Sequence, residues 1–304
     1  DYMNAAVQKA PTTYAASLIR MSIEPDQVEI KTAEGKVDSS ATYYHYRQHY
    51  WDNTDLTDER ILRAPVFQNK FDEYIGKVVP QIPDTINKLA DDLISRMSST
   101  PELFKFAVHN ITYKYETSEI MGMDAVFVHM AQSYYCPKGN EPSKATWMSK
   151  DKLDKLCERA RKQAPIVIGA KAKNIILTDT TEQRWIDMYK MPSEYVLVVF
   201  WDPHCGHCKK TLPDLYKQYQ EKLKPIGVEV YSVAKATDST LFADWKAFIR
   251  DNKLYWTNVG LTWHVYADAK KNSGKYIPQY TTIESLNYAE AWDVFSTPRF
   301  FLLD

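Results

Sequence analysis

The strongest constraint on the fold is a continuous apolar run, Tyr-Val-Leu-Val-Val-Phe-Trp, over residues 195–201. A strand of this kind, with no alternating polar positions, is typical of a sheet that is covered on both faces. Helical patterns follow over 206–223 and 242–252, and a further strand pattern lies between them over 227–233. Because strands and helices alternate here, the sequence predicts an α/β sheet with parallel strand pairs.

The first half of the chain has a different, helical pattern that runs from residue 41 to about residue 163. Thr100 is expected to cap a helix whose first residue is Pro101, since proline is favoured at the first helical position. Asp84 is expected to cap the preceding helix in the same way. No repeat of fixed period links the helices, so a known helical-repeat family is not indicated. The first half is therefore predicted to be all-α.

The boundary between the two patterns falls at an Ala-Pro pair that precedes two short strand patterns, over 166–168 and 174–177. We therefore expect a helical domain over 1–164 and an α/β domain over 165–304. The sequence closes on an apolar strand pattern over 300–303. Since a domain rarely ends on such a strand, the second domain is expected to lack its last elements.

Composition excludes several classes of function. The chain has 38 Lys and Arg against 39 Asp and Glu, so it has no basic excess for binding nucleic acid. Four cysteines in 304 residues exclude a disulfide-rich scaffold. No apolar run approaches the roughly 18 residues of a membrane-spanning helix. The remaining composition is that of an ordinary globular protein.

The chemically informative motif is Cys205-Gly206-His207-Cys208, placed where the apolar strand gives way to a helix. Two cysteines at this spacing can form a disulfide within one helical turn. Unpaired N–H groups and the dipole of the helix stabilise a thiolate at the first cysteine, and a neighbouring imidazolium adds to the effect. Only a thiolate attacks a disulfide, and a second thiol must be near to resolve the mixed disulfide. A CxxC at this place in a β-α-β pattern predicts thiol–disulfide exchange.

A metal site is the main alternative for these thiols, because His204 adds an imidazole beside them. A closed zinc site needs four ligands, and the other cysteines, Cys136 and Cys157, lie far away in the helical half. A thiolate-selective copper site stays open. Attachment of a c-type haem is excluded because Lys209 follows Cys208. We predict no resident metal and no cofactor.

A set of features along the second half resembles the thioredoxin superfamily. They are a Phe-Trp pair ending the buried strand, the CxxC, a proline in the following helix and a Thr-Pro pair ahead of a late strand: Phe200, Trp201, Pro213, Thr297 and Pro298. The resemblance covers about 166–304 and is to the TlpA/ResA type of extracytoplasmic thiol-disulfide oxidoreductase, often grouped with AhpC/TSA proteins. The region over about 40–163 is similar to a helical domain of unknown function that precedes such modules in Bacteroidetes envelope proteins.

The resemblance implies a role for individual positions. Cys205 would be the nucleophile and Cys208 the resolving thiol. Pro298 would be a cis-proline beside the disulfide, and Thr297 would contact an extended segment of a client protein. Trp201 would pack beneath the active-site turn. The implied activity is thiol–disulfide exchange on protein substrates.

Some positions depart from the thioredoxin pattern. Val199 stands where thioredoxins carry a buried Asp that helps to deprotonate the resolving cysteine, so the proton acceptor for Cys208 is unidentified. His204 replaces a Trp, and Gly-His replaces Gly-Pro between the cysteines. The Gly-His pair is that of disulfide isomerases and predicts a reduction potential nearer about −180 mV than about −270 mV. A peroxiredoxin is not expected, since Val198 and Asp202 occupy the places of its Pro and Thr.

The resemblance also implies partners and a location. These are protein thiol or disulfide clients, a redox partner that resets the pair, and the periplasm or cell envelope, with a lipid anchor outside this sequence. It leaves open whether the direction is reduction, oxidation or isomerisation. A second hypothesis also stays open, in which the chain is a non-enzymatic envelope binding protein. The helical domain would then bind a partner, and the CxxC would be a scaffold or a metal-thiolate site.

The remaining motifs are expected to be structural. The aromatic run over 43–51 is expected to be a helix packing on the core. Within it, His45 and His49 have the spacing of a metal pair on a helix, although no carboxylate completes a known motif. His109 and His129 lie in apolar helical patterns and are expected to be core histidines.

Two points stay undecided at this level. Cys136 and Cys157 form either a disulfide or free buried thiols. The aromatic-rich stretch over 238–291 forms either a cap near Cys205 or a small core of its own.

Overall fold

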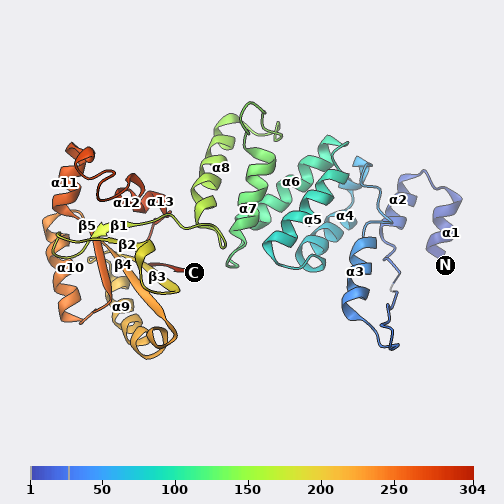
Figure 1. The fold of residues 1–304 in the computed structure, drawn as a ribbon. Coiled ribbons are helices and arrows are strands. Elements are labelled where there is room, and N and C mark those ends of the chain that lie inside the picture. The colour runs from blue at the N-terminus through green and yellow to red at the C-terminus, as the bar shows by residue number, and fades with distance from the viewer. Residues whose placement is uncertain (1, 27) are drawn as a thin grey trace. The chain divides into compact units, whose positions relative to one another are not determined.

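The computed structural model describes residues 2–26 and 28–304, which form two compact units, one up to Ile168 and one from Gly169 (Figure 1). The prediction of a helical region followed by an α/β domain is confirmed. Across the described residues, no helix is both long and apolar enough to cross a bilayer.

The N-terminal unit is built from helices. Its α-helices are α1 (Tyr2–Lys9), α2 (Tyr14–Met21), α3 (Ser39–His49), α4 (Pro65–Glu73), α5 (Pro83–Arg96), α6 (Pro101–Glu116), α7 (Asp124–Met130) and α8 (Lys150–Gln163). Short 3-10 or π segments extend or join them at Glu59–Arg63, Tyr74–Val78, Ala131–Tyr135 and Ala164–Ile166. Because α4, α5 and α6 all begin on a proline, their starts are fixed by a residue whose missing N–H costs nothing there.

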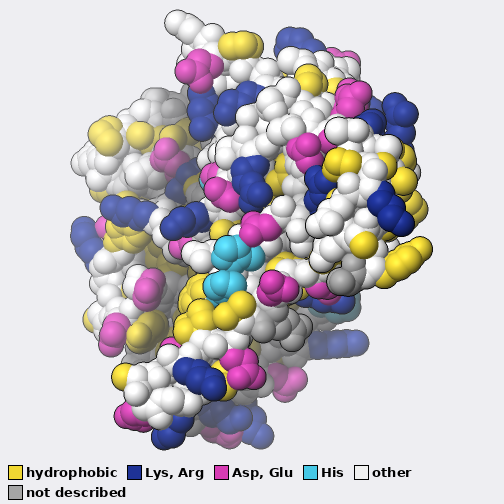
Figure 2. Space-filling model, turned by 90° about the vertical axis from the view of Figure 1, so that its right-hand side faces the viewer, with side chains coloured by type: hydrophobic (Ala, Val, Ile, Leu, Met, Phe, Trp, Pro, Cys, Tyr) yellow, Lys and Arg dark blue, Asp and Glu magenta, His cyan; other side chains and the backbone are white. Residues whose placement is uncertain are grey.

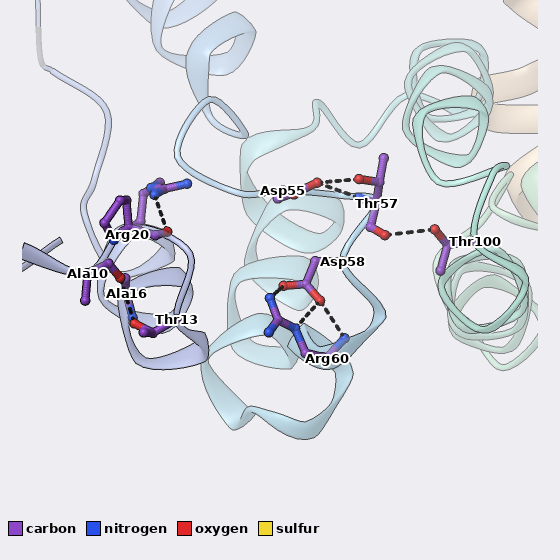
Figure 3. Close-up of polar contacts among 10 residues, drawn as sticks. Ala10, Thr13, Ala16, Arg20, Asp55, Thr57, Asp58, Arg60 and Thr100 are labelled. Carbon is purple, nitrogen blue, oxygen red and sulfur yellow. Dashed lines mark hydrogen bonds and ion pairs between the residues drawn. The ribbon is translucent and has the colours of Figure 1, made fainter. Parts of the chain in front are cut away.

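Side chains near two helix starts of this unit make hydrogen bonds of different kinds (Figure 3). The Thr13 hydroxyl accepts the Ala16 N–H at the start of α2, at 3.2 Å. Thr100 is the N-cap of α6, as predicted, but its hydroxyl donates to the carbonyl of Thr57 instead of bonding its own helix. The predicted cap of α5 is wrong, because α5 begins at Pro83 and Asp84 lies within its first turn. There its carboxylate still faces the positive end of the helix dipole.

The aromatic run contributes to the core at its end. Tyr50 and Trp51, which follow α3, are almost completely buried. They pack against each other and against Tyr74. Within α3 itself, by contrast, none of the described residues is fully buried, and Tyr44 is exposed. The aromatic run therefore packs on the core mainly through Tyr50 and Trp51, at and just after the end of α3.

The C-terminal unit is one mixed sheet with helices on both faces (Figure 1). Its strands are β1 (Ile176–Thr178), β2 (Trp185–Asp187), β3 (Tyr195–Trp201), β4 (Val228–Ala236), β5 (Thr257–Thr262) and β6 (Arg299–Leu303), in the order β2-β1-β5-β4-β3-β6. Its α-helices are α9 (Gly206–Gln218), α10 (Ser239–Asp251), α11 (Trp263–Lys271), α12 (Ile283–Leu286) and α13 (Tyr288–Ala291). The β3–β4 and β4–β5 pairs are parallel, whereas β6 lies antiparallel to β3.

The apolar sequence of strand β3 follows from its burial on both faces of the sheet. Val198 and Phe200 belong to the core on one face of the sheet. Val199 and Trp201 belong to the core on the other face, together with Cys208. Since successive side chains of a strand point to opposite faces, covering both faces removes every polar position.

One expectation about a connecting segment is corrected, and one of two open alternatives for another is not found. The strand predicted over 166–168 does not form, because a 3-10 turn and loop occupy this stretch. The stretch over 238–291 and the Trp292 that follows it pack no separate core, because their buried aromatic residues join the two cores of the sheet. Trp256 packs on the α9 and α10 side, and Tyr288 and Trp292 pack on the other.

A substitution at Gly260 tests how closely the sheet is packed, because β5 lies very near its neighbours at this residue. A Cβ added to Gly260 would lie 3.0 Å from the Ala234 carbonyl oxygen and 3.2 Å from the Trp245 ring. We expect Gly260→Ala to lower the free energy of unfolding by about 1–3 kcal/mol through overpacking. Gly206→Ala is the control, since an added Cβ there has no heavy atom within 4 Å. Equal stability of both variants in urea denaturation would contradict this packing.

Candidate active site

The two cysteines lie at the junction of β3 and α9. Cys205 is the N-cap of α9, and its sulfur accepts the backbone N–H of Cys208 at 3.4 Å. The side chain of the N-cap residue meets the unpaired N–H groups at the positive end of the helix dipole. Both cysteines are free thiols; Cys205 is half-buried and Cys208 is fully buried.

The environments of the two thiols differ in their electrostatic effect. Burial acts to raise the pKa of Cys205, but hydrogen bonds from the thiol and N–H of Cys208, from the Thr297 side chain and from the His207 N–H together lower it. For Cys208, burial raises the pKa to about 11, and the neighbouring sulfur of Cys205 adds to the increase. The half-buried thiol of Cys205 is thus the one that ionises more readily, and the buried thiol of Cys208 keeps its proton at neutral pH.

A loop from far along the chain completes the site. The Cys205 thiol donates to the carbonyl oxygen of Thr297, at 3.2 Å, across a separation of 92 residues. The Thr297–Pro298 peptide bond is cis. Pairing of β6 with β3 brings this loop to the cysteines, because Arg299 lies opposite Phe200.

The other predicted site residues lie around the cysteines in different ways. Trp201 is buried, and its indole N–H donates to the Ser232 hydroxyl at 2.8 Å. It packs on Phe248 within the core that also holds Cys208. The His207 side chain is exposed, whereas its backbone N–H faces the Cys205 sulfur.

Sequence reasoning missed two acidic groups at the active-site turn. Asp244 of α10 lies 2.7 Å from His204, measured from Oδ2 to Nε2. Asp202 accepts the His204 N–H on Oδ1, at 2.8 Å, and its Oδ2 lies 3.4 Å from the Lys235 ammonium. The Asp202–Lys235 pair could have been found from the sequence. Parallel pairing of β3 with β4 brings residues 202 and 235 to neighbouring places at the strand ends.

The candidate histidines outside this site are not buried as expected. His109 is exposed, so its assignment to the core was wrong. His129 is partly exposed and bonds the Asp91 carboxylate at 2.9 Å. The rings of His45 and His49 lie 4.3 Å apart. Figure 2 shows histidine side chains side by side on an exposed face, among hydrophobic and acidic groups.

No His, Cys, Asp and Glu side chains gather in threes to hold a metal ion anywhere in residues 2–26 and 28–304. The remaining two cysteines, Cys136 and Cys157, form a disulfide. This bond joins the end of the segment after α7 to the middle of α8, and it settles the choice left open between a bridge and free thiols.

The divergent pKa values predict selective alkylation. At neutral pH, iodoacetamide is expected to modify Cys205 well before Cys208, because only the Cys205 pKa lies below the ordinary thiol value. As pH rises toward about 11, Cys208 should begin to react, since deprotonation then overcomes its burial. Peptide mapping by mass spectrometry measures both rates, with unfolded protein as the control in which they converge. Equal rates in the folded protein at neutral pH would contradict the assignment.

Comparison with known proteins agrees with this geometry. Residues 8–163 match the family described as a domain of unknown function, DUF5106. Residues 168–304 match the AhpC/TSA family. No curated protein matches the chain.

Several solved structures of bacterial proteins are similar to this chain. A thioredoxin-like protein from Bacteroides caccae is 15% identical, with 93% of this chain and 92% of that chain covered and a TM-score of 0.54. A domain described as a possible thiol-disulfide isomerase from Cytophaga hutchinsonii is 30% identical, covering 46% of this chain and 80% of that one, with a TM-score of 0.35. The thioredoxin domain of a thiol-disulfide oxidoreductase from Bacteroides vulgatus is 26% identical, covering 45% and 80%, with a TM-score of 0.34. The chain therefore belongs to the DUF5106 family and continues into a thioredoxin-like domain of the AhpC/TSA family.

Proposed function

We propose that this protein is a thiol-disulfide oxidoreductase that exchanges disulfides with client proteins through Cys205 and Cys208. One observation carries the proposal above the others. A thiol of lowered pKa at a helix N-terminus lies beside a buried thiol of raised pKa, in a thioredoxin-like domain. This asymmetry gives one attacking and one resolving group, which is what exchange requires.

The reaction follows from that asymmetry. The Cys205 thiolate attacks one sulfur of a client disulfide, and the other client sulfur leaves as a thiolate. Cys208 then loses its proton and attacks the Cys205 sulfur of the mixed disulfide. The client is released as a dithiol. It has gained two electrons from the cysteine pair, which is now oxidised to a Cys205–Cys208 disulfide. In the reverse direction the same pair oxidises a client dithiol.

The surrounding residues have supporting roles in this proposal. The loop at Thr297 and Pro298 lies beside Cys205 and would pair its backbone with an extended client segment. Trp201 supports the turn from below, since its ring is fixed by Ser232 and by the core that contains Cys208. His207 contributes its backbone N–H, which favours the Cys205 thiolate.

The disulfide in the N-terminal unit supports an extracytoplasmic location. Stable disulfides form and persist in oxidising compartments and are rare in the cytosol. The Cys136–Cys157 bond is of the structural kind, since it joins two segments of a helical core. This supports our proposal that the protein acts in the periplasm or cell envelope. A redox partner that resets Cys205–Cys208 and a lipid anchor outside this sequence belong to the same proposal.

Trapping of clients tests the function. In Cys208→Ser the first attack proceeds but the mixed disulfide is not resolved, so covalent adducts of client proteins should accumulate. They should appear on non-reducing gels of an envelope extract and disappear on reduction. Cys205→Ser is the matched control, which keeps Cys208 but lacks the attacking thiol. Adducts that form equally with both variants, or with neither, would contradict the proposal and favour a binding role for the helical unit.

A further inference from the structure

Two histidines of the helical unit have no part in the proposed exchange chemistry. His45 and His49 lie four residues apart in α3, so their side chains project from the same face of the helix. His45 is partly exposed and His49 is exposed, and their ring centroids are 4.3 Å apart. Histidines at this spacing on a helix can bind one metal ion together.

Each of the two rings has a nitrogen that can coordinate a metal. The Nδ1 atom of His49 lies 2.6 Å from the Asp52 carboxylate, and this bond leaves Nε2 for another ligand. Within residues 2–26 and 28–304, no hydrogen bond engages Nε2 of His49 or either ring nitrogen of His45. Neutral imidazole nitrogens are common ligands of copper, nickel and zinc. The pair therefore offers one donor atom from each ring.

Asp52 gives His49 the outer contact that metal-binding histidines usually have. Such a histidine commonly donates its second ring N–H to a carboxylate, which fixes the tautomer and makes the ring a better ligand. The backbone N–H of Asp52 also donates to the His49 carbonyl at 3.1 Å, so a turn holds the carboxylate next to the ring. With the proton on Nδ1, the free electron pair of His49 is on Nε2.

The backbone that carries these side chains is anchored in the core of the helical unit. Tyr50 and Trp51, which follow His49 directly, are almost completely buried. The Tyr50 hydroxyl also donates to the carbonyl of Lys70 at 3.0 Å. Because the end of α3 is fixed, only side-chain torsions change when an ion binds. A site held in this way loses little conformational entropy on binding, which favours affinity.

We propose that His45 and His49 form a surface site for an exchangeable divalent transition-metal ion, with Cu²⁺ bound most tightly. Imidazole suits copper, nickel and zinc, and the affinity of a given site is highest for Cu²⁺. No third His, Cys, Asp or Glu ligand joins the pair in the described part of the chain, so water completes the coordination. The site lies in a different compact unit from Cys205 and Cys208, and it does not depend on their chemistry.

Titration calorimetry with Cu²⁺ tests the site, at about pH 7.5, where free histidine is largely neutral. The full chain carries Cys205→Ser and Cys208→Ala as its background, because free thiols compete for copper. We expect one ion to bind per chain. Asp52→Ala should weaken binding by about 10-fold, the usual effect of losing an outer carboxylate. Loss of a direct ligand, in His45→Asn or His49→Asn, should weaken it further.

His109→Asn is the matched control, since it removes a single exposed imidazole from another helix, α6, and should leave the affinity unchanged. The electron paramagnetic resonance spectrum of bound Cu²⁺ then identifies its ligands. We expect splitting from two nitrogens, reduced to one in His45→Asn or His49→Asn. Affinity that survives removal of both histidines, or falls equally in His109→Asn, would overturn the site. So would a copper spectrum without nitrogen splitting.

Discussion

The active site depends on the pairing of β3 with its neighbours in the middle of the sheet. Parallel pairing with β4 aligns the carboxyl ends of these strands, where the active-site turn begins. Antiparallel pairing with β6 brings the loop at Thr297 to the same end. Because β3 is covered on both faces, its final residue cannot shift without moving two cores at once. The position of Cys205 at the start of α9 is therefore fixed by the two cores that pack on β3, which involve many more residues than the site itself.

This scaffold gives two chemically identical thiols opposite properties. Cys205 meets N–H donors at the helix start, and the donors outweigh the effect of its burial. One helical turn later, Cys208 lies in the core beside Trp201, and desolvation is the main cause of its raised pKa. In the proposed mechanism, the difference between the attacking and the resolving cysteine thus comes from how deeply each thiol is buried.

The sequence predicted the fold and the redox-active cysteine pair more fully than it predicted the contacts around the two cysteines. A long apolar strand followed by Cys-Gly-His-Cys indicates both the fold and the redox pair, because strand burial and helix starts leave strong local patterns. The apolar pattern over 300–303 predicted strand β6, whereas the role of the Thr-Pro loop before it could be recognised only by resemblance. Asp202 and Lys235 were not paired, since their contact depends on strand register rather than on spacing along the chain. His109 was misplaced because an apolar helical pattern does not state which face is covered. The Cys136–Cys157 bond likewise depends on how α8 packs.

The reduction potential of the Cys205–Cys208 pair tests the central claim most directly. The protein is equilibrated in glutathione buffers, and the state of the pair is followed by Trp201 fluorescence and by counting free thiols. Cys205→Ser serves as the control for any signal from other groups. The account predicts a reversible two-electron transition, nearer about −180 mV than about −270 mV because His207 favours the thiolate. Failure of the pair to form a disulfide, or thiols that react only after a bound metal is removed, would contradict it.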